Sequence, residues 1–268
     1  MTVPAGASDA SAEPDPYEPA AAAPGTELPG AEPPEAEPPG AESPEADATA
    51  PAWLGRLAAA ARKMVVPASM RPPPTGGRPS AVLILFGEDE TGPDVLLVQR
   101  SPWLRRHAGQ PAFPGGAIDA ADGGPVSAAL REAAEEALVD PASVDVLAEL
   151  PELFITRSGF AVTPVLAWWR RPGPVGPGDP DEVTAVRRVP VADLANPANR
   201  LTIRYPTGQG GPAFRTAGML IWGFTGYIVD RLLALGGWEQ PWDAGNVQGL
   251  PPSVLTARAG ETAPDRNL

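Results

Sequence analysis

The residues best suited to chemistry gather in two adjoining segments of the chain. The first, RSPWLRRHAGQPAFPGG (100–116), holds three arginines, the only histidine of the chain and a glycine pair. The second, GGAIDAADGGPVSAALREAAEEALVD (115–140), is rich in carboxylates. Guanidinium groups bind phosphate oxygens through paired hydrogen bonds, and carboxylate oxygens bind hard divalent cations. Together the two segments predict a metal site in the second segment and a binding site for a phosphorylated ligand beside it in the first.

The carboxylates of the second segment lie at helical spacing. Glu136 follows Glu132 by four residues and Glu135 follows it by three, so a helix over 126–138 projects all three toward one side. Anions this close repel, and burying them uncompensated is costly. Arg131, four residues before Glu135, and a divalent cation are the two available compensations. Taken alone, such a run is also typical of a solvated helix face.

The scarcity of other reactive side chains narrows the chemistry. The chain has no cysteine, which excludes disulfides, thiolate nucleophiles and cysteine zinc sites. Its single histidine, His107, excludes metal motifs with two histidines. Its single lysine, Lys63, follows Ala-Ala-Ala-Arg, which excludes a GxxxxGK[ST] phosphate loop. An enzyme made from this chain would therefore use carboxylates, arginines, hydroxyls and a bound metal.

The negative charge is concentrated near the N-terminus. Of the 33 acidic residues, eleven lie in residues 1–50, which hold no Lys or Arg, and this leaves 22 acids against 20 bases in the remainder. A near-neutral remainder argues against nucleic acid as a partner, because that partner needs a basic face. Residues 1–50 are also rich in Pro, Ala and Glu. They bury too little apolar surface to offset an ordering entropy of roughly 1–2 kcal/mol per residue, so we expect a disordered acidic tail.

No membrane segment is expected. The start of the chain has neither a basic beginning nor an apolar core of the kind found in signal peptides. The longest apolar candidate, GMLIWGFTGYIV (218–229), stops at Asp230 and is shorter than the ~20 residues that span a bilayer. We therefore expect a cytoplasmic protein.

The rest of the chain predicts one mixed α/β domain. A short helix and linker occupy 51–69, the domain covers 70–245, and a flexible C-terminal tail follows over 246–268. Hydrophobic patterns predict the domain's strands and helices. The strands are expected at 81–86, 94–100, 145–150, 161–169 and 182–191, and the helices at 126–138 and 219–235.

The spacing in the second segment resembles the Nudix box of the Nudix hydrolase family. Gly116 is followed by five residues, an acid at Asp122, a short run and then REAAEE (131–136). The run before Arg131 is one residue longer than usual, and Asp stands where the family commonly has Glu. Leu138 stands where the family has a glycine after the glutamate pair. The resemblance implies a Nudix-type α/β/α sandwich with a mixed β-sheet.

The stretch before the box is similar to the leader motif of the coenzyme A pyrophosphatase subgroup. That motif reads roughly LLTxRS, then RxHxGQ, then FPGG, and the chain has LLVQRSPWLRRHAGQPAFPGG (96–116). Val98 replaces the threonine, and Pro111 takes a position that is more often aliphatic. Residues 158–165 and 221–233 also look like this subgroup. The likeness implies hydrolysis of the diphosphate of coenzyme A or its thioesters, giving adenosine 3′,5′-bisphosphate and a 4′-phosphopantetheine product.

The resemblance also implies roles for particular residues. Mg²⁺ or Mn²⁺ would be held by Glu132, Glu135, Glu136 and the carbonyl of Gly115, with Arg131 orienting the carboxylates. The expected substrate-binding residues are Arg100, Arg105, His107, Gln110, Gly115 and Gly116.

Several alternatives remain open. Glu132 is the preferred general base, and Glu149 and Glu182 are lesser candidates. Another nucleoside diphosphate derivative, such as an ADP-sugar, a dinucleotide or a nucleoside triphosphate, is the first alternative substrate. A non-catalytic coenzyme A-binding or regulatory protein is the second alternative. The sequence also leaves a homodimer open.

Overall fold

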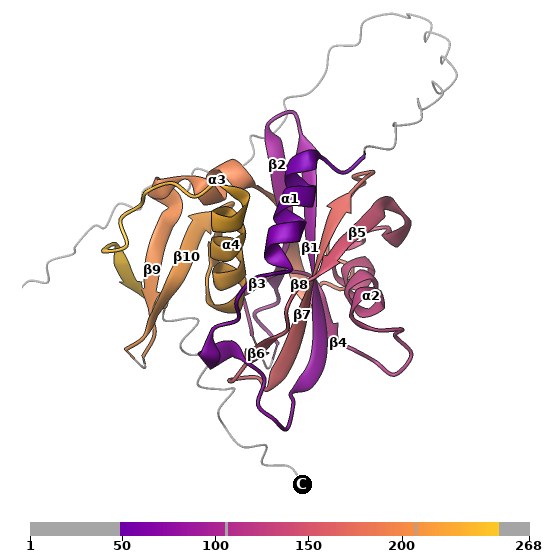
Figure 1. Ribbon diagram of the computed structural model, residues 1–268, viewed down its shortest axis with the longest axis horizontal. Helices are drawn as coiled ribbons and strands as arrows, with labels where there is room; N and C mark the ends of the chain where they lie inside the picture. The colour runs from indigo at the N-terminus through magenta and orange to yellow at the C-terminus, as the bar shows by residue number, and fades with distance from the viewer. Residues whose placement is uncertain (1–48, 105–106, 207, 252–268) are drawn as a thin grey trace, which may run out of the picture. The chain divides into compact units, whose positions relative to one another are not determined.

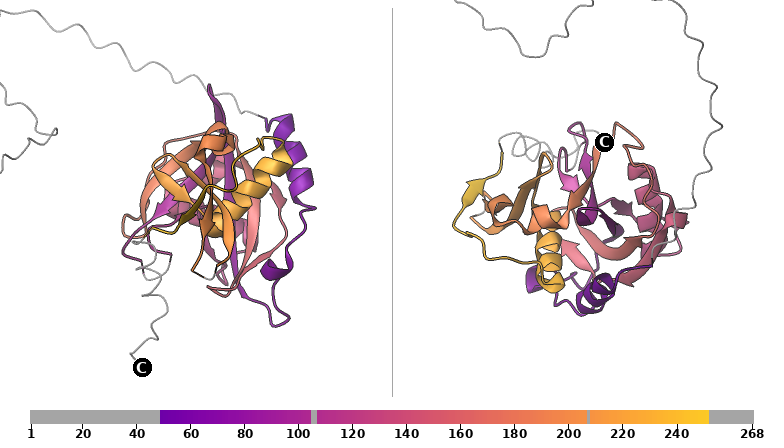
Figure 2. Two further views of the ribbon diagram at one scale, coloured as in Figure 1. Left: turned by 90° about the vertical axis from the view of Figure 1, so that its left-hand side faces the viewer. Right: turned by 90° about the horizontal axis from the view of Figure 1, so that it is seen from above.

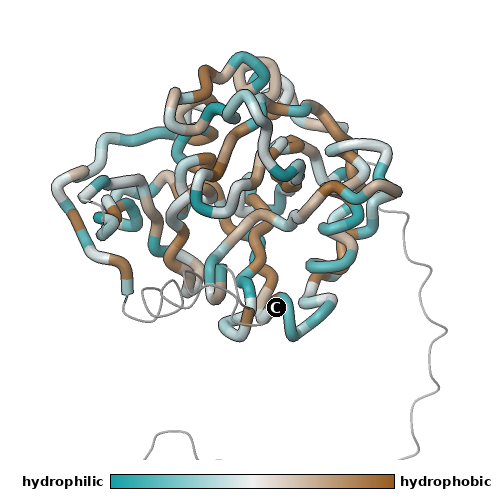
Figure 3. The backbone as a smooth tube through the Cα atoms, turned by 90° about the horizontal axis from the view of Figure 1, so that it is seen from below, coloured by the Kyte–Doolittle hydropathy of each residue, from teal (hydrophilic) through white to brown (hydrophobic). Residues whose placement is uncertain are grey.

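The longest apolar runs of the chain form strands that are buried on both faces. The computed structural model describes residues 49–104, 107–206 and 208–251. In β1 (Arg78–Asp89), side chains alternate between the two faces, so that Ile84 and Phe86 enter one core and Leu83 and Leu85 enter another. The tube in Figure 3 shows hydrophobic segments alternating with hydrophilic ones along the backbone. Apolar strands of this kind belong to a sheet that helices cover on both faces.

Eight strands form the larger sheet. Its main order is β3-β2-β1-β7-β5, with β4 pairing to β1, β6 to β7 and β8 to β2. The β1–β7 pair is parallel and the other pairs are antiparallel. The sheet is therefore mixed. The remaining bounds are β2 (Gly92–Arg100), β3 (Pro111–Ala112), β4 (Gly115–Ala117), β5 (Val144–Glu149), β6 (Leu153–Ile155), β7 (Phe160–Trp169) and β8 (Val183–Pro190).

Helices cover both faces of this sheet. Helix α2 (Pro125–Ala137) packs its alanines into one core, and α1 (Ala52–Ala61) and α4 (Gly223–Gly236) pack into the other. Figure 1 shows α2 and α4 on opposite sides of the strands, and Figure 2 shows α1 beside α4. The predicted α/β/α sandwich with a mixed sheet is confirmed. In the part of the chain that the structure describes, no helix is both long and apolar enough to span a membrane.

Helix α1 shares a core with the domain that was expected to begin at residue 70. Leu54 and Leu57 are fully buried in the same cluster as the apolar face of α4. Trp53 also meets the rings of Phe86 and Trp238 edge-on, at 5.6 and 5.1 Å between centroids. Helix α1 therefore packs as part of the same core as the domain that was expected to begin at residue 70.

A second, four-stranded sheet was not predicted. Its order is β11-β10-β9-β12, with bounds β11 (Met219–Ile221), β10 (Gly210–Thr216), β9 (Arg200–Arg204) and β12 (Val247–Gly249). The expected helix 219–235 is wrong at its start, because 219–221 turn back onto β10 and α4 begins only at Gly223. The expected tail 246–268 is also wrong at its start, since β12 pairs in parallel with β9. Residues 1–48 and 252–268 lie outside the described residues.

Four short segments connect these elements. They are α3 (Val191–Ala195) and the single 3₁₀ turns Ala68–Met70, Pro141–Ser143 and Pro197–Asn199. Helix α3 joins the two sheets in the chain, because it follows β8 of the larger sheet and precedes β9 of the smaller one.

Candidate active site

Helix α2 approaches the sheet closely because the residues on its inner face are small. It begins after Gly124, whose φ of +136° favours glycine, and Pro125 occupies the first helical position, where a missing N–H costs nothing. The side chains packed on the sheet are Ala128, Ala129, Ala133 and Ala137. The glutamates lie beside this alanine face, next to β4.

The three glutamates have unequal surroundings. Their side chains are 4% (Glu136), 17% (Glu132) and 59% (Glu135) exposed. Glu136 accepts hydrogen bonds from Arg100 Nη1 at 2.8 Å and from the Gly115 N–H at 3.0 Å. The carboxylate of Glu132 lies directly against Gly116. The two buried glutamates therefore meet the glycine pair, while Glu135 faces outward.

Arg131 links the acids of the helix to the loop before it. Its guanidinium donates to both carboxylate oxygens of Asp122 at 3.1 and 3.0 Å, to Glu132 at 3.0 Å and to Glu135 at 2.9 Å. A further bond of 3.2 Å reaches the carbonyl of Ala117. These bonds lower the pKa of Asp122 and raise that of Arg131. Arg131 thus holds loop, strand and helix in one arrangement, and Asp122, for which the sequence predicted no role, is its bidentate partner.

Burial dominates the electrostatics of the inner carboxylates. It raises the pKa of Glu136 to about 7, although Arg100 and the Gly115 N–H favour the ionised form. Burial also raises the pKa of Glu132; Arg131 opposes this, while Glu135 and Glu182 add to it by repulsion. Ionised carboxylates in these positions are therefore stabilised by additional positive charge.

The ligand atoms around Glu132, Glu136 and Gly115 are of the kind that a hard cation binds. Glu132 and Glu136 repel each other at close range, and all the available ligand atoms are oxygens. In an antiparallel strand the N–H and C=O of one residue face the same edge, so the Gly115 carbonyl faces the acids together with its N–H. Within the described residues, however, no three acidic or histidine side chains converge as a cation site. Arg131 pairs with Glu132 and Glu135 instead.

The leader stretch folds into a loop that closes on itself at the end of β2. The N–H of Arg100 donates to the Gln110 carbonyl at 3.1 Å, and that of Gly109 to the Ser101 carbonyl at 3.2 Å. The ring of His107 lies 3.3 Å from the Gln110 side chain, measured from Nδ1 to Oε1. Arg100 Nε is buried and has no hydrogen-bond partner among the described residues. Arg105 lies outside the described residues.

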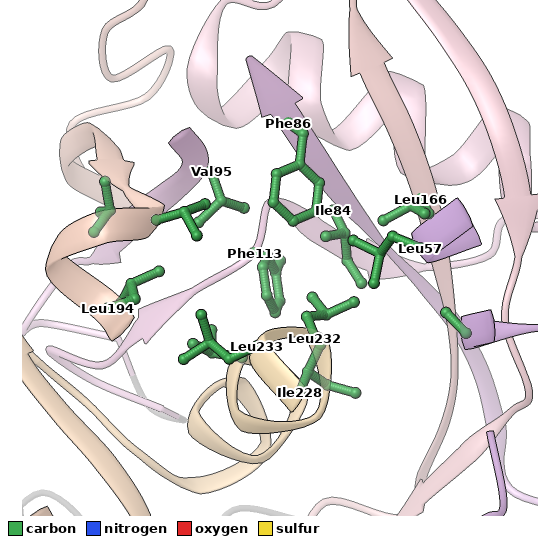
Figure 4. Packing of buried hydrophobic residues seen from close by; sticks show 14 of the residues in the cluster. Leu57, Ile84, Phe86, Val95, Phe113, Leu166, Leu194, Ile228, Leu232 and Leu233 are labelled. Carbon is green, nitrogen blue, oxygen red and sulfur yellow. The ribbon is translucent and has the colours of Figure 1, made fainter. Parts of the chain in front are cut away.

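A cavity of about 350 Å³ adjoins these groups. Its lining brings together five residues of the sequence prediction: Arg100, His107, Gln110, Gly115 and Gly116. Phe113 of the same stretch lines it as well but belongs mainly to the core, between Phe86 and the α4 side chains Leu232 and Leu233 (Figure 4). Neither of the two lesser candidates for a base lines the cavity: Glu182 raises the pKa of Glu132 by repulsion, and Glu149 is exposed on β5.

The opposite wall of the cavity was not predicted. It comes from the β6–β7 hairpin, from the residues that directly follow β9 and β11, and from the start of α4. Its aromatic and charged members are Phe160, Arg157, Tyr205, Trp222 and Phe224. The family-like character of 158–165 and 221–233 marked two of these segments, but nothing in their residue types indicated a shared cavity.

The loop 170–181 supports the C-terminal end of the acidic helix. The N–H groups of Gly176 and Gly178 donate to the carbonyls of Ala137 and Glu136 at 3.3 and 3.2 Å. These bonds satisfy carbonyls that the last turn of a helix leaves unpaired. Leu138 ends the helix in the left-handed conformation, with φ of 59°.

The chain is similar to known Nudix hydrolases. The NUDIX domain family matches residues 77–207. The uncharacterized Nudix hydrolase NudL of Klebsiella aerogenes is 49% identical over 35% of this chain and 77% of its own length. NudL of Cronobacter sakazakii is 40% identical over 56% of this chain and 78% of its own length. The match to NudL of Klebsiella pneumoniae covers 52% of that protein.

One solved structure is similar to part of the chain. A Nudix hydrolase from M. smegmatis, RenU, is 27% identical over 48% of this chain and 83% of that chain, with a TM-score of 0.39. On the family match and the NudL relatives, the chain belongs to the Nudix hydrolase family.

Proposed function

We propose that this Nudix hydrolase is a cytoplasmic enzyme that cleaves the diphosphate bond of coenzyme A or its thioesters. The products are adenosine 3′,5′-bisphosphate and a 4′-phosphopantetheine derivative. The observation that carries the proposal is one shared cavity: the leader residues Arg100, His107 and Gln110 line it together with the glycine pair that contacts the buried glutamates.

The leader residues suit the diphosphate of such a substrate. Arg100 is held by Glu136 through Nη1, which leaves its buried Nε–H to donate to a phosphate oxygen. His107 and Gln110 add polar groups on the same side of the cavity. Because the glycines carry no side chain, the Glu132 carboxylate can lie against Gly116 at the edge of the same cavity.

The acids of α2 suit the hydrolytic step. Glu132, Glu135, Glu136 and the Gly115 carbonyl would hold Mg²⁺ or Mn²⁺. The cation, when bound, would neutralise charge on the phosphoryl oxygens and lower the pKa of water. Arg131 keeps Glu132 and Glu135 in position. Glu132 is the proposed general base that takes the proton from the attacking water, with Glu182 as the second candidate.

The test is direct. The purified chain is incubated with coenzyme A and Mg²⁺ or Mn²⁺, and adenosine 3′,5′-bisphosphate is measured by chromatography. Rates on NADH and ADP-ribose are compared at the same enzyme concentration, and preference for either of these would replace coenzyme A as the substrate. Binding of coenzyme A without turnover at any metal concentration would instead identify a non-catalytic binding protein.

Two variants test the acids. Glu136→Gln keeps the shape of the side chain and removes its charge, so turnover falls by orders of magnitude while the fold is retained. Glu152→Gln, at an exposed residue outside the cavity lining, is the matched control and keeps wild-type turnover. Unchanged turnover in Glu136→Gln would contradict the metal assignment.

A further inference from the structure

The cavity has a second cationic end that the proposed hydrolysis does not use. Among the described residues, Arg100 and Arg157 are the arginines that line it. Arg157 is exposed and lies in the turn between β6 and β7. That turn is well defined, because the N–H groups of Ser158 and Gly159 both donate to the Ile155 carbonyl, at 3.1 and 2.9 Å.

The two ends are separated along β1. Gly115 lies opposite Val82 and Phe160 lies opposite Arg78, four residues away, which corresponds to about 13 Å along the strand. The turn that carries Arg157 lies beyond Phe160. A single phosphate at the glycine pair is therefore too far away to be shared with the β6–β7 turn. A ligand that uses both ends must carry two separated anionic groups.

Aromatic side chains line the same cavity as the two arginines. Trp222 pairs with Tyr205 at 6.1 Å between ring centroids, and Phe224 follows in the first turn of α4. Thr225 anchors this wall to the leader stretch, since its buried hydroxyl donates to the Pro111 carbonyl at 3.1 Å. Rigid aromatic faces of this kind stack on planar rings.

We propose that this part of the cavity binds the adenosine 3′-phosphate end of the substrate, with Arg157 as the ligand of the 3′-phosphate. The inference rests on the proposed function and adds an orientation to it. The adenosine end has a planar base and a second phosphate, which match the aromatic wall and Arg157. The pantetheine end carries no anion, so it leaves the cavity on the other side of the diphosphate.

The experiment compares coenzyme A with dephospho-coenzyme A, which lacks only the 3′-phosphate. The wild-type chain, with Mg²⁺ or Mn²⁺, has a kcat/KM about 10- to 100-fold higher on coenzyme A, the range of one charge-assisted contact. Arg157→Ala removes this preference, chiefly through KM, and changes kcat/KM on dephospho-coenzyme A less than twofold. Arg157→Lys restores part of the preference. Arg56→Ala, at an exposed position of α1, is the control and keeps it.

A binding measurement gives a second readout that does not depend on turnover. By calorimetry, adenosine 3′,5′-bisphosphate binds the wild-type chain more tightly than 5′-AMP, and Arg157→Ala binds the two alike. If the wild-type chain hydrolyses both coenzymes equally well, the proposed function holds and the inference is overturned. An equal loss on both coenzymes in Arg157→Ala also overturns it. If neither coenzyme is hydrolysed, the proposed function fails, and the calorimetry alone decides whether Arg157 reads a 3′-phosphate.

Discussion

Arg100 and Glu136 form a 2.8 Å ion pair that joins the end of β2 to the acidic helix α2. Glu136 is almost fully buried, whereas the Arg100 side chain is 23% exposed. A buried carboxylate that loses its cation is left as an uncompensated charge, which costs more than the pair contributes when intact. The pair therefore couples the stability of the fold to the geometry of the site.

Arg100→Ala is expected to lower the free energy of unfolding by about 2–4 kcal/mol, because Glu136 then keeps its desolvation without its partner. Arg100→Ala combined with Glu136→Gln recovers most of this loss, since a neutral amide needs no cation. Urea unfolding followed by circular dichroism measures both variants. A double variant as unstable as Arg100→Ala would contradict the explanation by charge.

Substitutions at Gly115 and Gly116 are expected to affect stability and activity to different degrees. A Cβ on Gly115 would lie 2.3 Å from the Ala81 carbonyl oxygen and 2.7 Å from Val82 Cα, which are backbone atoms that cannot move independently. A Cβ on Gly116 would lie 2.3 Å from Glu132 Oε1, the end of a flexible side chain. The same substitution therefore has different consequences at adjacent positions.

Gly115→Ala is expected to lower the free energy of unfolding by about 2–3 kcal/mol, as overpacking against backbone does. Gly116→Ala costs less than about 1 kcal/mol but lowers turnover at least 10-fold, because it displaces the Glu132 carboxylate. Thermal unfolding and turnover on the identified substrate are measured in parallel. Full activity in Gly116→Ala would show that the position of Glu132 is unimportant.

Much of the larger sheet could be predicted because its strands carry apolar side chains on both faces. The runs in β1, β2 and β7 have no other stable location in a protein of this size. The smaller sheet lacks this signal: β10 contains two glycines and a proline, and all three residues of β12 are exposed. These strands form because β9 is available for them to pair with, and the residue composition of β10 and β12 does not indicate this pairing.

The candidate site, too, could be predicted only in part from the sequence. The spacing of the glutamates predicted one helix and a common side, and α2 has the expected position in the chain. Their unequal burial could not be predicted, because it depends on Arg100 and Gly115, which reach Glu136 only through the pairing of β1, β2 and β4. Likewise, the helical period of MLIWGF concealed the turn at Gly223, where φ is +67°.

Leu138 adopts a left-handed backbone conformation that is less favourable for leucine than for glycine. It adopts a φ of 59° at the end of α2 and is 57% exposed, so little packing offsets the strain. Leu138→Gly is expected to raise the free energy of unfolding by about 0.5–1 kcal/mol and to leave turnover within twofold. Gly237→Ala, at the equivalent end of α4 with φ of 74° and open space around it, shifts stability by a similar amount in the opposite direction. Guanidinium titrations of both variants provide the comparison, and a destabilised Leu138→Gly would contradict the assignment of strain.

Gly178 lies against the last turn of the acidic helix α2. A Cβ there would lie 1.8 Å from the carbonyl oxygen of Glu135, so Gly178→Ala must separate the loop from the last turn of α2. We expect a loss of about 2–3 kcal/mol in unfolding free energy and at least a 10-fold lower turnover, because that turn carries Glu135 and Glu136.

Gly173→Ala is the matched control in the same loop, since a Cβ at Gly173 meets no atom within 4 Å. It is expected to stay within about 0.5 kcal/mol of the wild-type free energy of unfolding, with unchanged turnover. Both variants are measured by urea unfolding and by product formation. Equal effects at the two positions would mean that the loop acts through its own flexibility, whereas a selective effect at Gly178 identifies it as the support that keeps the glutamates of α2 at the cavity.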